Sequence, residues 1–346
     1  MSSKENKYLD ILQIFRGFAA LMVVVHHTLG ALVYYNNIDY YFVKFIGDLG
    51  KYGVDFFFVL SGFIIAFTSY YKYNKPLAYR KYIINRALRI YVPYIPIGYL
   101  MLFLYANYPE LSNASQLDFS YLTSLTLLPD GFPAYGVAWT LIFELMFYFL
   151  FSLTFISKKL WNWFLIIWLI LILKNNFITD VVSNQKTFQN VFLSLYNLEF
   201  MLGYLLSILI IRKVKWNYMF VGTLFIVFTL FSLVLKYYNI ILFKFSDHIF
   251  VGINSFLLIY ISVTYFNPKL NERNVFMMIG NATYSIYLIH DPLKTLIIRL
   301  FPSTNSLILN FLILTVVLII CSIAGYIYYL IFEKYIMNKF KKTLGV

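Results

Sequence analysis

Arg16 and His27 stand eleven residues apart in an apolar stretch near the start of the chain, residues 11–33. At about 100° per residue, eleven residues complete three helical turns, so both side chains lie on one face of a helix. With a rise of about 1.5 Å per residue they are about 16 Å apart along its axis, whereas His26 points about 100° away from His27. Histidine exchanges protons near neutral pH, so His27 is a candidate general base. The structural alternative is an arginine that extends to the lipid headgroups and a histidine that binds a carbonyl.

Three other ionisable residues, Glu144, His290 and Asp55, each stand in a different apolar stretch of the chain. Ionisable groups inside a membrane are costly and are functional candidates by default. A histidine with carboxylates nearby suits proton transfer at neutral pH. The alternative is a structural polar network between helices, and the presence of two histidines and a glutamate at one membrane depth argues against it.

Arg86 and Arg89 are three residues apart, so they are neighbours on the surface of a helix. They precede an apolar stretch and follow a basic segment, which places them at the cytoplasmic mouth of a membrane span. Two arginine forks at such a mouth could hold the phosphates of a ligand. An ordinary positively charged flank of a membrane helix is the alternative.

The elements that must position these residues are long apolar helices. The chain has 346 residues, of which 61% are hydrophobic and only 12% charged, whereas about a quarter of an average soluble protein is charged. A membrane span needs about 20 apolar residues, so we predict one all-α domain over 1–346, a bundle of about ten transmembrane helices. A polar segment at about 107–137 is expected to cap its extracytoplasmic face. The ten apolar runs are 11–33, 44–70, 87–106, 138–156, 160–173, 188–211, 217–235, 246–266, 275–298 and 306–332.

The basic residues lie mainly in the loops of one side. Of the 28 lysines and arginines, those on the side of the N-terminus outnumber those on the other side by roughly two to one, which predicts cytoplasmic N- and C-termini. This bias also accounts for the net charge of +13 without a nucleic-acid partner. The polar first ten residues lead into the first apolar run without a small-residue cleavage site, so we expect no removed signal peptide. The single cysteine, Cys321, excludes a disulfide framework.

Five sequence fragments occur in an order that is typical of one enzyme family. They are the pair Arg16-x10-His27, the segment Gly53–Phe63, the pair Arg86-x-x-Arg89, Trp139-Thr140-Leu141 with Glu144 and Tyr148, and the segment Tyr284–His290. Together, on a ten-span chain, they resemble acyltransferase family 3, bacterial membrane enzymes that O-acetylate surface and exported polysaccharides. The resemblance covers nearly the whole chain. It departs from the family pattern in having two adjacent histidines, His26 and His27, of which the spacing selects His27. Many relatives carry a fused esterase-like domain, and we expect none here.

The resemblance implies an acyl-CoA-dependent O-acetyltransferase of the bacterial cytoplasmic membrane. Acetyl-CoA would enter from the cytoplasm as acyl donor, and a hydroxyl of an extracytoplasmic glycan would accept the acetyl group. His27 would act as general base or take the acetyl group itself, and both routes stay open. Which glycan is acylated, and whether the group is acetyl or another short acyl chain, is open as well.

The same resemblance assigns roles to the remaining candidates. Arg16 would line the pantetheine channel, and Glu144 would orient or charge-stabilise His27. The full set of expected site residues is catalytic His27, Glu144 and His290, donor-binding Arg16, Arg86 and Arg89, and substrate-binding Asp55, Trp139 and Tyr287. No metal and no haem are expected.

Three other classes of protein fit the sequence less well. A transporter or flippase for a lipid-linked sugar would also use charges inside the membrane, but the Arg86 and Arg89 pair and the His27 geometry favour an enzyme. A haem protein would need His27 and His290 as axial ligands, and only four histidines exist. A rhomboid-like protease built on Ser61 has no further support.

Overall fold

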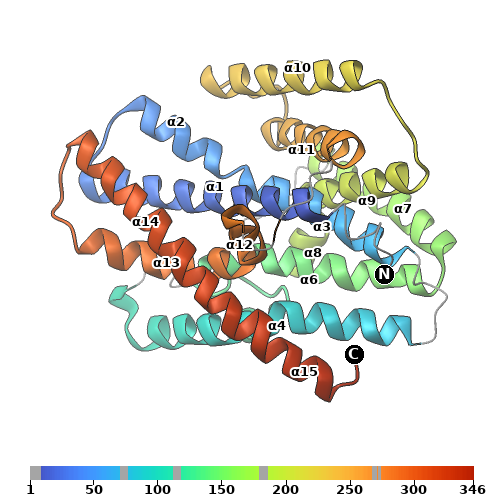
Figure 1. The fold of residues 1–346 in the computed structure, drawn as a ribbon, viewed down its shortest axis with the longest axis horizontal. Coiled ribbons are helices and arrows are strands. Elements are labelled where there is room, and N and C mark those ends of the chain that lie inside the picture. The colour runs from blue at the N-terminus through green and yellow to red at the C-terminus, as the bar shows by residue number, and fades with distance from the viewer. Residues whose placement is uncertain (1–8, 71–76, 112–117, 179–185, 267–270, 272–273) are drawn as a thin grey trace. The chain divides into compact units, whose positions relative to one another are not determined.

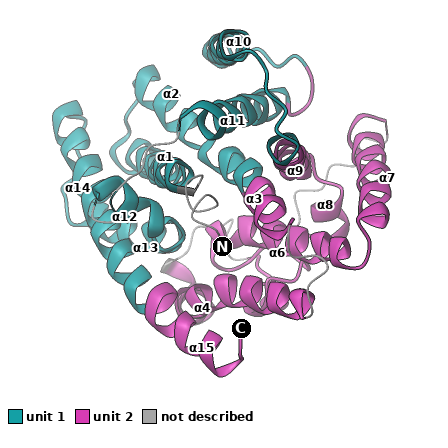
Figure 2. Cartoon of the chain, turned by 45° about the vertical axis from the view of Figure 1, so that its right-hand side comes forward, with its two compact units in different colours: residues 1–60, 209–242, 246–331 teal, residues 61–208, 243–245, 332–346 magenta. Residues whose placement is uncertain are grey.

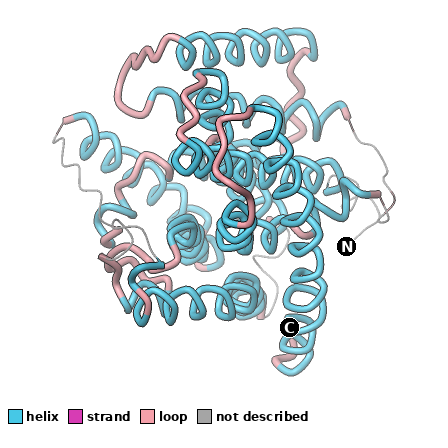
Figure 3. Tube along the Cα trace, turned by 90° about the vertical axis from the view of Figure 1, so that its left-hand side faces the viewer, coloured by secondary structure: helices cyan, strands magenta, loops and turns pink. Residues whose placement is uncertain are grey.

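The computed structural model describes residues 9–70, 77–111, 118–178, 186–266, 271 and 274–346. Over these residues the chain forms helices joined by short loops, with no β-strand (Figure 3). One isolated antiparallel bridge joins Asp130 and Thr187. The prediction of an all-α membrane bundle is confirmed.

The described helices follow one another along the chain as Figure 1 shows. They are α1 (Leu9–Asn36), α2 (Tyr41–Gly50), α3 (Gly53–Ser69), α4 (Ala78–Asn107), η2 (Pro109–Leu111), α5 (Tyr121–Thr126), η4 (Gly136–Ala138), α6 (Trp139–Phe151), η5 (Ser152–Phe155), α7 (Lys158–Phe177), α8 (Phe188–Phe192), α9 (Asn197–Ile211), α10 (Tyr218–Tyr237), α11 (Ser246–Tyr265), α12 (Val275–Asn281), α13 (Thr283–Arg299), α14 (Leu307–Tyr328), the π-helix η6 (Tyr329–Ile336) and α15 (Met337–Thr343).

Several long helices begin where a polar side chain caps the first turn. The side-chain oxygens of Ser157, Asn217 and Ser306 accept hydrogen bonds from backbone N–H groups at the starts of α7, α10 and α14. Such caps satisfy N–H groups that have no partner inside the helix. The apolar stretch that follows each cap then continues as helix, because lipid leaves a backbone no partner other than itself.

Nine helical segments among the described residues are long and apolar enough to cross a membrane. They coincide with nine of the ten predicted runs, and the fifth, α7, is longer than the predicted 160–173. The run at 275–298 differs, because it divides into the short α12 and the 17-residue α13. The polar residues His290, Asp291 and Lys294 lower the hydropathy of α13, and their side chains are mostly buried.

The chain divides into two compact units, coloured separately in Figure 2. Unit 1 comprises residues 1–60, 209–242 and 246–331, and unit 2 comprises residues 61–208, 243–245 and 332–346. The predicted site residues are split between them. Unit 1 holds Arg16, His27, Asp55, Tyr287 and His290, and unit 2 holds Arg86, Arg89, Trp139 and Glu144.

Helix α1 is the central helix of unit 1 and contacts α2, α11, α12, α13 and α14. Gly280 lets α12 approach α1 closely, because a Cβ atom there would lie 2.2 Å from the carbonyl oxygen of Gln13. Small residues at such crossings allow membrane helices to pack backbone against backbone. The apolar core around α1 includes Ala20, Val24, Ile286, Ile313, Val317 and Cys321.

Unit 2 is built on α4, α6 and α7 and has an aromatic core. The rings of Phe147 and Phe200 stack with centroids 4.5 Å apart, and Trp161 meets Phe151 edge-on at 5.5 Å. Helix α4 contains Pro93 and packs against α5, α6 and α15. Large rigid rings bury much apolar area at little cost in side-chain entropy, which suits a core that must hold α6 in place.

Candidate active site

His27 on α1 and His290 on α13 form a pair of imidazoles inside unit 1. Their ring centroids are 5.2 Å apart and their planes are tilted by 40°. His290 is fully buried. The two histidines that the sequence placed at one membrane depth therefore meet.

The hydrogen bond of His290 fixes which ring nitrogen carries the proton. Its Nδ1–H donates to the carbonyl oxygen of Tyr287 over 2.6 Å, and a carbonyl can only accept. In the neutral form of the ring, Nε2 of His290 is therefore the unprotonated nitrogen. This atom is buried and has no hydrogen-bond partner among the residues that the structure describes. An imidazole nitrogen held in this way can accept a proton or a hydrogen bond from a group beside it.

His26 takes a different part in the structure. Its Nδ1–H donates to the carbonyl oxygen of Gly47 over 2.7 Å, which ties α1 to α2. Its ring lies 5.0 Å from that of His27, centroid to centroid. The adjacent histidines thus face different neighbours, His26 a backbone carbonyl and His27 a second imidazole.

An ion pair beside the two imidazoles was missed by the sequence reasoning. Nζ of Lys294 lies 2.8 Å from Oδ1 of Asp291, and both side chains are mostly buried. Both charges interact electrostatically with His27 and His290. The i, i+3 spacing directly after His290 was the available signal, because such residues are neighbours on a helix.

Arg16 lies on the same helix as His27, three turns away, about 16 Å along the axis. Its Nη1 donates to Oε1 of Gln13 over 2.9 Å. Tyr287, which supplies the carbonyl acceptor to His290, is buried and meets Phe57 edge-on with ring centroids 6.3 Å apart. The roles expected of Arg16 and Tyr287 stay predictions.

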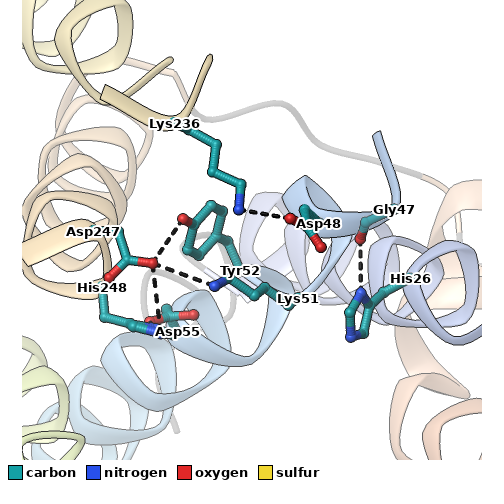
Figure 4. A network of polar contacts seen from close by, with 9 residues as sticks. All are labelled: His26, Gly47, Asp48, Lys51, Tyr52, Asp55, Lys236, Asp247 and His248. Atoms are coloured by element: carbon teal, nitrogen blue, oxygen red, sulfur yellow. Dashed lines mark hydrogen bonds and ion pairs between the residues drawn. The ribbon is translucent and has the colours of Figure 1, made fainter. Parts of the chain in front are cut away.

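Asp55 is fully buried, and its Oδ1 accepts a hydrogen bond from Nδ1–H of His248 over 2.5 Å. Figure 4 shows the network that surrounds this pair. Asp247 accepts from the hydroxyl of Tyr52 over 3.0 Å and from Nζ of Lys51 over 3.3 Å. The assignment of Asp55 to substrate binding stays a prediction. Its partner His248, 193 residues away in the sequence, could not be found from local spacing.

Arg86 and Arg89 belong to a cationic cluster in unit 2. The Arg86 guanidinium lies 5.1 Å from the ring centroid of Tyr148, and that hydroxyl donates to Glu144. Lys341 of α15 interacts electrostatically with both arginines. Three cations near one end of α4 create the field that phosphate groups require. Lys341 was missed because only the packing of α15 on α4 brings it there.

Trp139 opens α6 and sits in an aromatic group. Its ring centroid is 5.3 Å from that of Tyr196 and 5.7 Å from that of Phe143. Phe143 is buried, whereas Trp139 remains half-buried. Trp139 is therefore the more exposed of these two rings.

Membrane-spanning helices that bury or half-bury histidines, arginines and carboxylates define a multi-pass membrane protein with polar groups inside its helical units. The sequence matches the acyltransferase 3 family model, an acyltransferase domain, over residues 6–327. This match covers nearly the whole chain, so the chain belongs to that family and the predicted resemblance is confirmed. Membership favours a membrane acyltransferase over a transporter. No curated protein and no solved structure is significantly similar to the chain.

Proposed function

We propose that the protein transfers an acetyl group from cytoplasmic acetyl-CoA to a hydroxyl of an extracytoplasmic glycan, in the cytoplasmic membrane of a bacterium. The observation that carries this proposal is the contact between His27 and His290, in which Nε2 of His290 is a buried acceptor. Proton transfer is the chemistry that acyl transfer to a hydroxyl needs. The pair lies on the helix that also carries Arg16.

Two reaction routes use the pair of His27 and His290, and in each the bonds formed and broken and the protons balance. In direct transfer, His27 removes the proton of the acceptor hydroxyl, the oxygen attacks the thioester carbonyl, and the carbon–sulfur bond breaks. The CoA thiolate then takes up the proton. In the covalent route, a ring nitrogen of His27 attacks first, the carbon–sulfur bond breaks, and CoA leaves as the thiol with the proton that the imidazole loses. The acceptor oxygen later attacks the acyl carbon, the acyl–nitrogen bond breaks, and the hydroxyl proton returns to the imidazole. In both, His290 accepts a hydrogen bond or a proton from His27, and the charge of Asp291 stabilises the cationic ring that results.

The cluster of Arg86, Arg89 and Lys341 suits the phosphates of CoA. Guanidinium forks pair with phosphate oxygens through two parallel hydrogen bonds. The family assignment as an acyltransferase supports an activated acyl donor, and CoA is a donor that carries several phosphates. Equal binding of acetyl-CoA by the variant that lacks both arginines would contradict this role.

The test is thioester-dependent release of free CoA by the purified full-length protein in liposomes, together with mass spectrometry of cell-envelope glycans. We expect His27→Ala to abolish both the release and the acetyl increment of about 42 daltons while the protein inserts normally. His26→Asn is the matched control, because an asparagine amide can still donate to Gly47. Unchanged acetylation by His27→Ala would refute the assignment. An acyl-enzyme trapped on His27 and cleaved by hydroxylamine would select the covalent route.

A further inference from the structure

Lys186, just before α8, points its ammonium into three aromatic rings. Its Nζ lies 4.9 Å from the ring centroid of Trp139, 5.6 Å from that of Phe143 and 5.7 Å from that of Phe132. An ammonium within about 6 Å of a ring centroid is attracted by the negative face of the ring. We call Lys186 and these three rings the lysine cage.

Among the residues that the structure describes, the cation of the lysine cage has no ion-pair partner. Lys186 also donates no hydrogen bond to any of them. The backbone of Asp130 pairs with that of Thr187, yet its carboxylate accepts from the hydroxyl of Ser120 over 2.6 Å. Burial lowers the pKa of Lys186 below the ordinary lysine value. A negative ligand would supply the ion pair that this ammonium does not form with the described residues.

Two of the three rings of the cage are partly exposed. Phe143 is buried, but Phe132 is 36% exposed and Trp139 is half-buried. The exposed parts of these rings offer apolar faces on which the C–H groups of a sugar can lie, directly beside the positive charge. The N-terminus of α6, at Trp139, adds the positive end of a helix dipole to the same place.

The cage is also near an expected catalytic residue. Glu144 lies five residues after Trp139 on α6, about 7.5 Å along the helix axis. The cage adjoins the predicted extracytoplasmic cap segment, since Phe132 belongs to residues 107–137. A ligand in the cage would therefore lie on the side where the proposed acceptor arrives.

From this arrangement we infer that the lysine cage is an acceptor subsite that binds an anionic group of the glycan, either the carboxylate of an acidic sugar or a phosphate. The inference rests on the proposed function, because it names the class of acceptor that the acyltransferase uses. Lys186 is a binding residue in this scheme. Its ammonium pairs with the anion while Trp139 and Phe132 contact the sugar ring.

A structural role makes a different prediction. If the contact between Lys186 and the rings only anchored the segment before α8, the acceptor's charge would be irrelevant. Lys158 provides a matched control, because its Nζ lies 4.4 Å from the ring centroid of Tyr70 in the same unit. Lys158→Gln removes a lysine–ring contact at the opposite, cytoplasmic end of the predicted topology.

The experiment compares cells that carry the wild-type protein, Lys186→Gln, Lys186→Arg, Lys158→Gln or His27→Ala in a background without the native gene. Envelope glycans are separated by anion exchange and weighed by mass spectrometry. We expect the acetyl increment on the retained, anionic fraction. Lys186→Gln removes one charge-assisted hydrogen bond to the anion, so we expect acetylation of the anionic glycan to fall about tenfold or more. Lys186→Arg keeps the positive charge, so its acetylation should stay within about threefold of wild type. Lys158→Gln should acetylate like the wild type.

The outcomes separate the two proposals. Acetylation confined to neutral glycans, or equal activity of Lys186→Gln and wild type, overturns the inference but leaves the proposed function standing if His27→Ala is inactive. Acetylation that persists in His27→Ala refutes the proposed function. Equal loss in the Gln and Arg variants would assign the cage a structural role and overturn the inference. Hexuronic acid or phosphate in the mass of the acetylated repeat identifies the anion.

A second measurement guards against misfolding. The affinity of purified Lys186→Gln for acetyl-CoA, measured by calorimetry, should stay within about threefold of wild type, because donor binding is assigned to Arg86 and Arg89. A variant that has also lost acetyl-CoA binding is impaired in more than acceptor binding, which contradicts the inference.

Discussion

Replacement of His290 by asparagine or glutamine tests the role of the imidazole pair. The amide of asparagine can donate to the Tyr287 carbonyl as Nδ1–H does, but it places no acceptor at the position of Nε2. Glutamine reaches further and can accept a hydrogen bond near that position, yet it cannot be protonated. The two variants therefore separate a hydrogen bond that orients His27 from a proton acceptor.

The expected magnitudes differ between the two roles. A neutral hydrogen bond contributes about 0.5–1.5 kcal/mol, which corresponds to roughly 2–13-fold in rate. A positioned acid or base contributes about 10²–10⁴-fold. Because Nε2 of His290 is buried and has no partner among the described residues, we expect a proton-accepting role, with kcat lowered about 100-fold or more in both variants.

The assay is acetyl transfer by the purified protein with saturating acetyl-CoA, with KM for acetyl-CoA measured separately. KM should stay within about threefold of wild type, since His290 is assigned to the chemical step and donor binding to the arginines. His290 is fully buried, so thermal unfolding must confirm that each variant folds. A glutamine variant within about threefold of the wild-type kcat would refute proton transfer and leave only orientation.

Three further predictions follow from the ion pairs and cations. Arg86→Gln with Arg89→Gln should raise KM for acetyl-CoA about 10–100-fold for each arginine–phosphate interaction that is removed, with binding of the acceptor unchanged, measured by calorimetry. Lys294→Met leaves the Asp291 carboxylate buried without its partner and should destabilise the protein by about 3 kcal/mol, and Asp291→Asn in the same chain should restore most of that stability in thermal unfolding. Burial lowers the pKa of Lys186 below its ordinary 10.5, so the cation disappears as pH rises through this lowered value. The rate of acetyl transfer to an anionic acceptor should therefore fall at a pH below the one at which free lysine loses its proton. In Lys186→Arg the cation persists at high pH, so the pH profile of that rate should not show this fall.

Most of the fold was predictable because lipid imposes local rules on the sequence. A span must be apolar over about 20 residues and must satisfy its own backbone, so hydropathy alone marks nine of the spans among the described residues. Helix α13 is the exception. It has only 17 residues, which is shorter than a full span. It is also too polar, because it carries His290, Asp291 and Lys294.

The candidate site was predictable where its residues share a helix. The eleven-residue spacing places Arg16 and His27 on one face of α1, and that follows from helix geometry without any partner. Contacts between elements were not predictable in this way. The bond between His248 and Asp55, like the approach of Lys341 to Arg86, depends on packing between segments far apart in the chain.

The polarity that weakens α13 as a membrane span is also what makes it a candidate catalytic element. A helix surrounded by lipid could not tolerate a histidine, an aspartate and a lysine within about one and a half turns. In unit 1 these groups are covered by α1 and α14, which contact α13, and Asp291 and Lys294 neutralise each other. The apolar neighbours thus offset the cost of the polar chemistry, and His290 is held beside His27 with its Nε2 buried and shielded from water. We therefore expect a drop in hydropathy within an otherwise membrane-like sequence to mark a candidate reactive element, and here it points to α13.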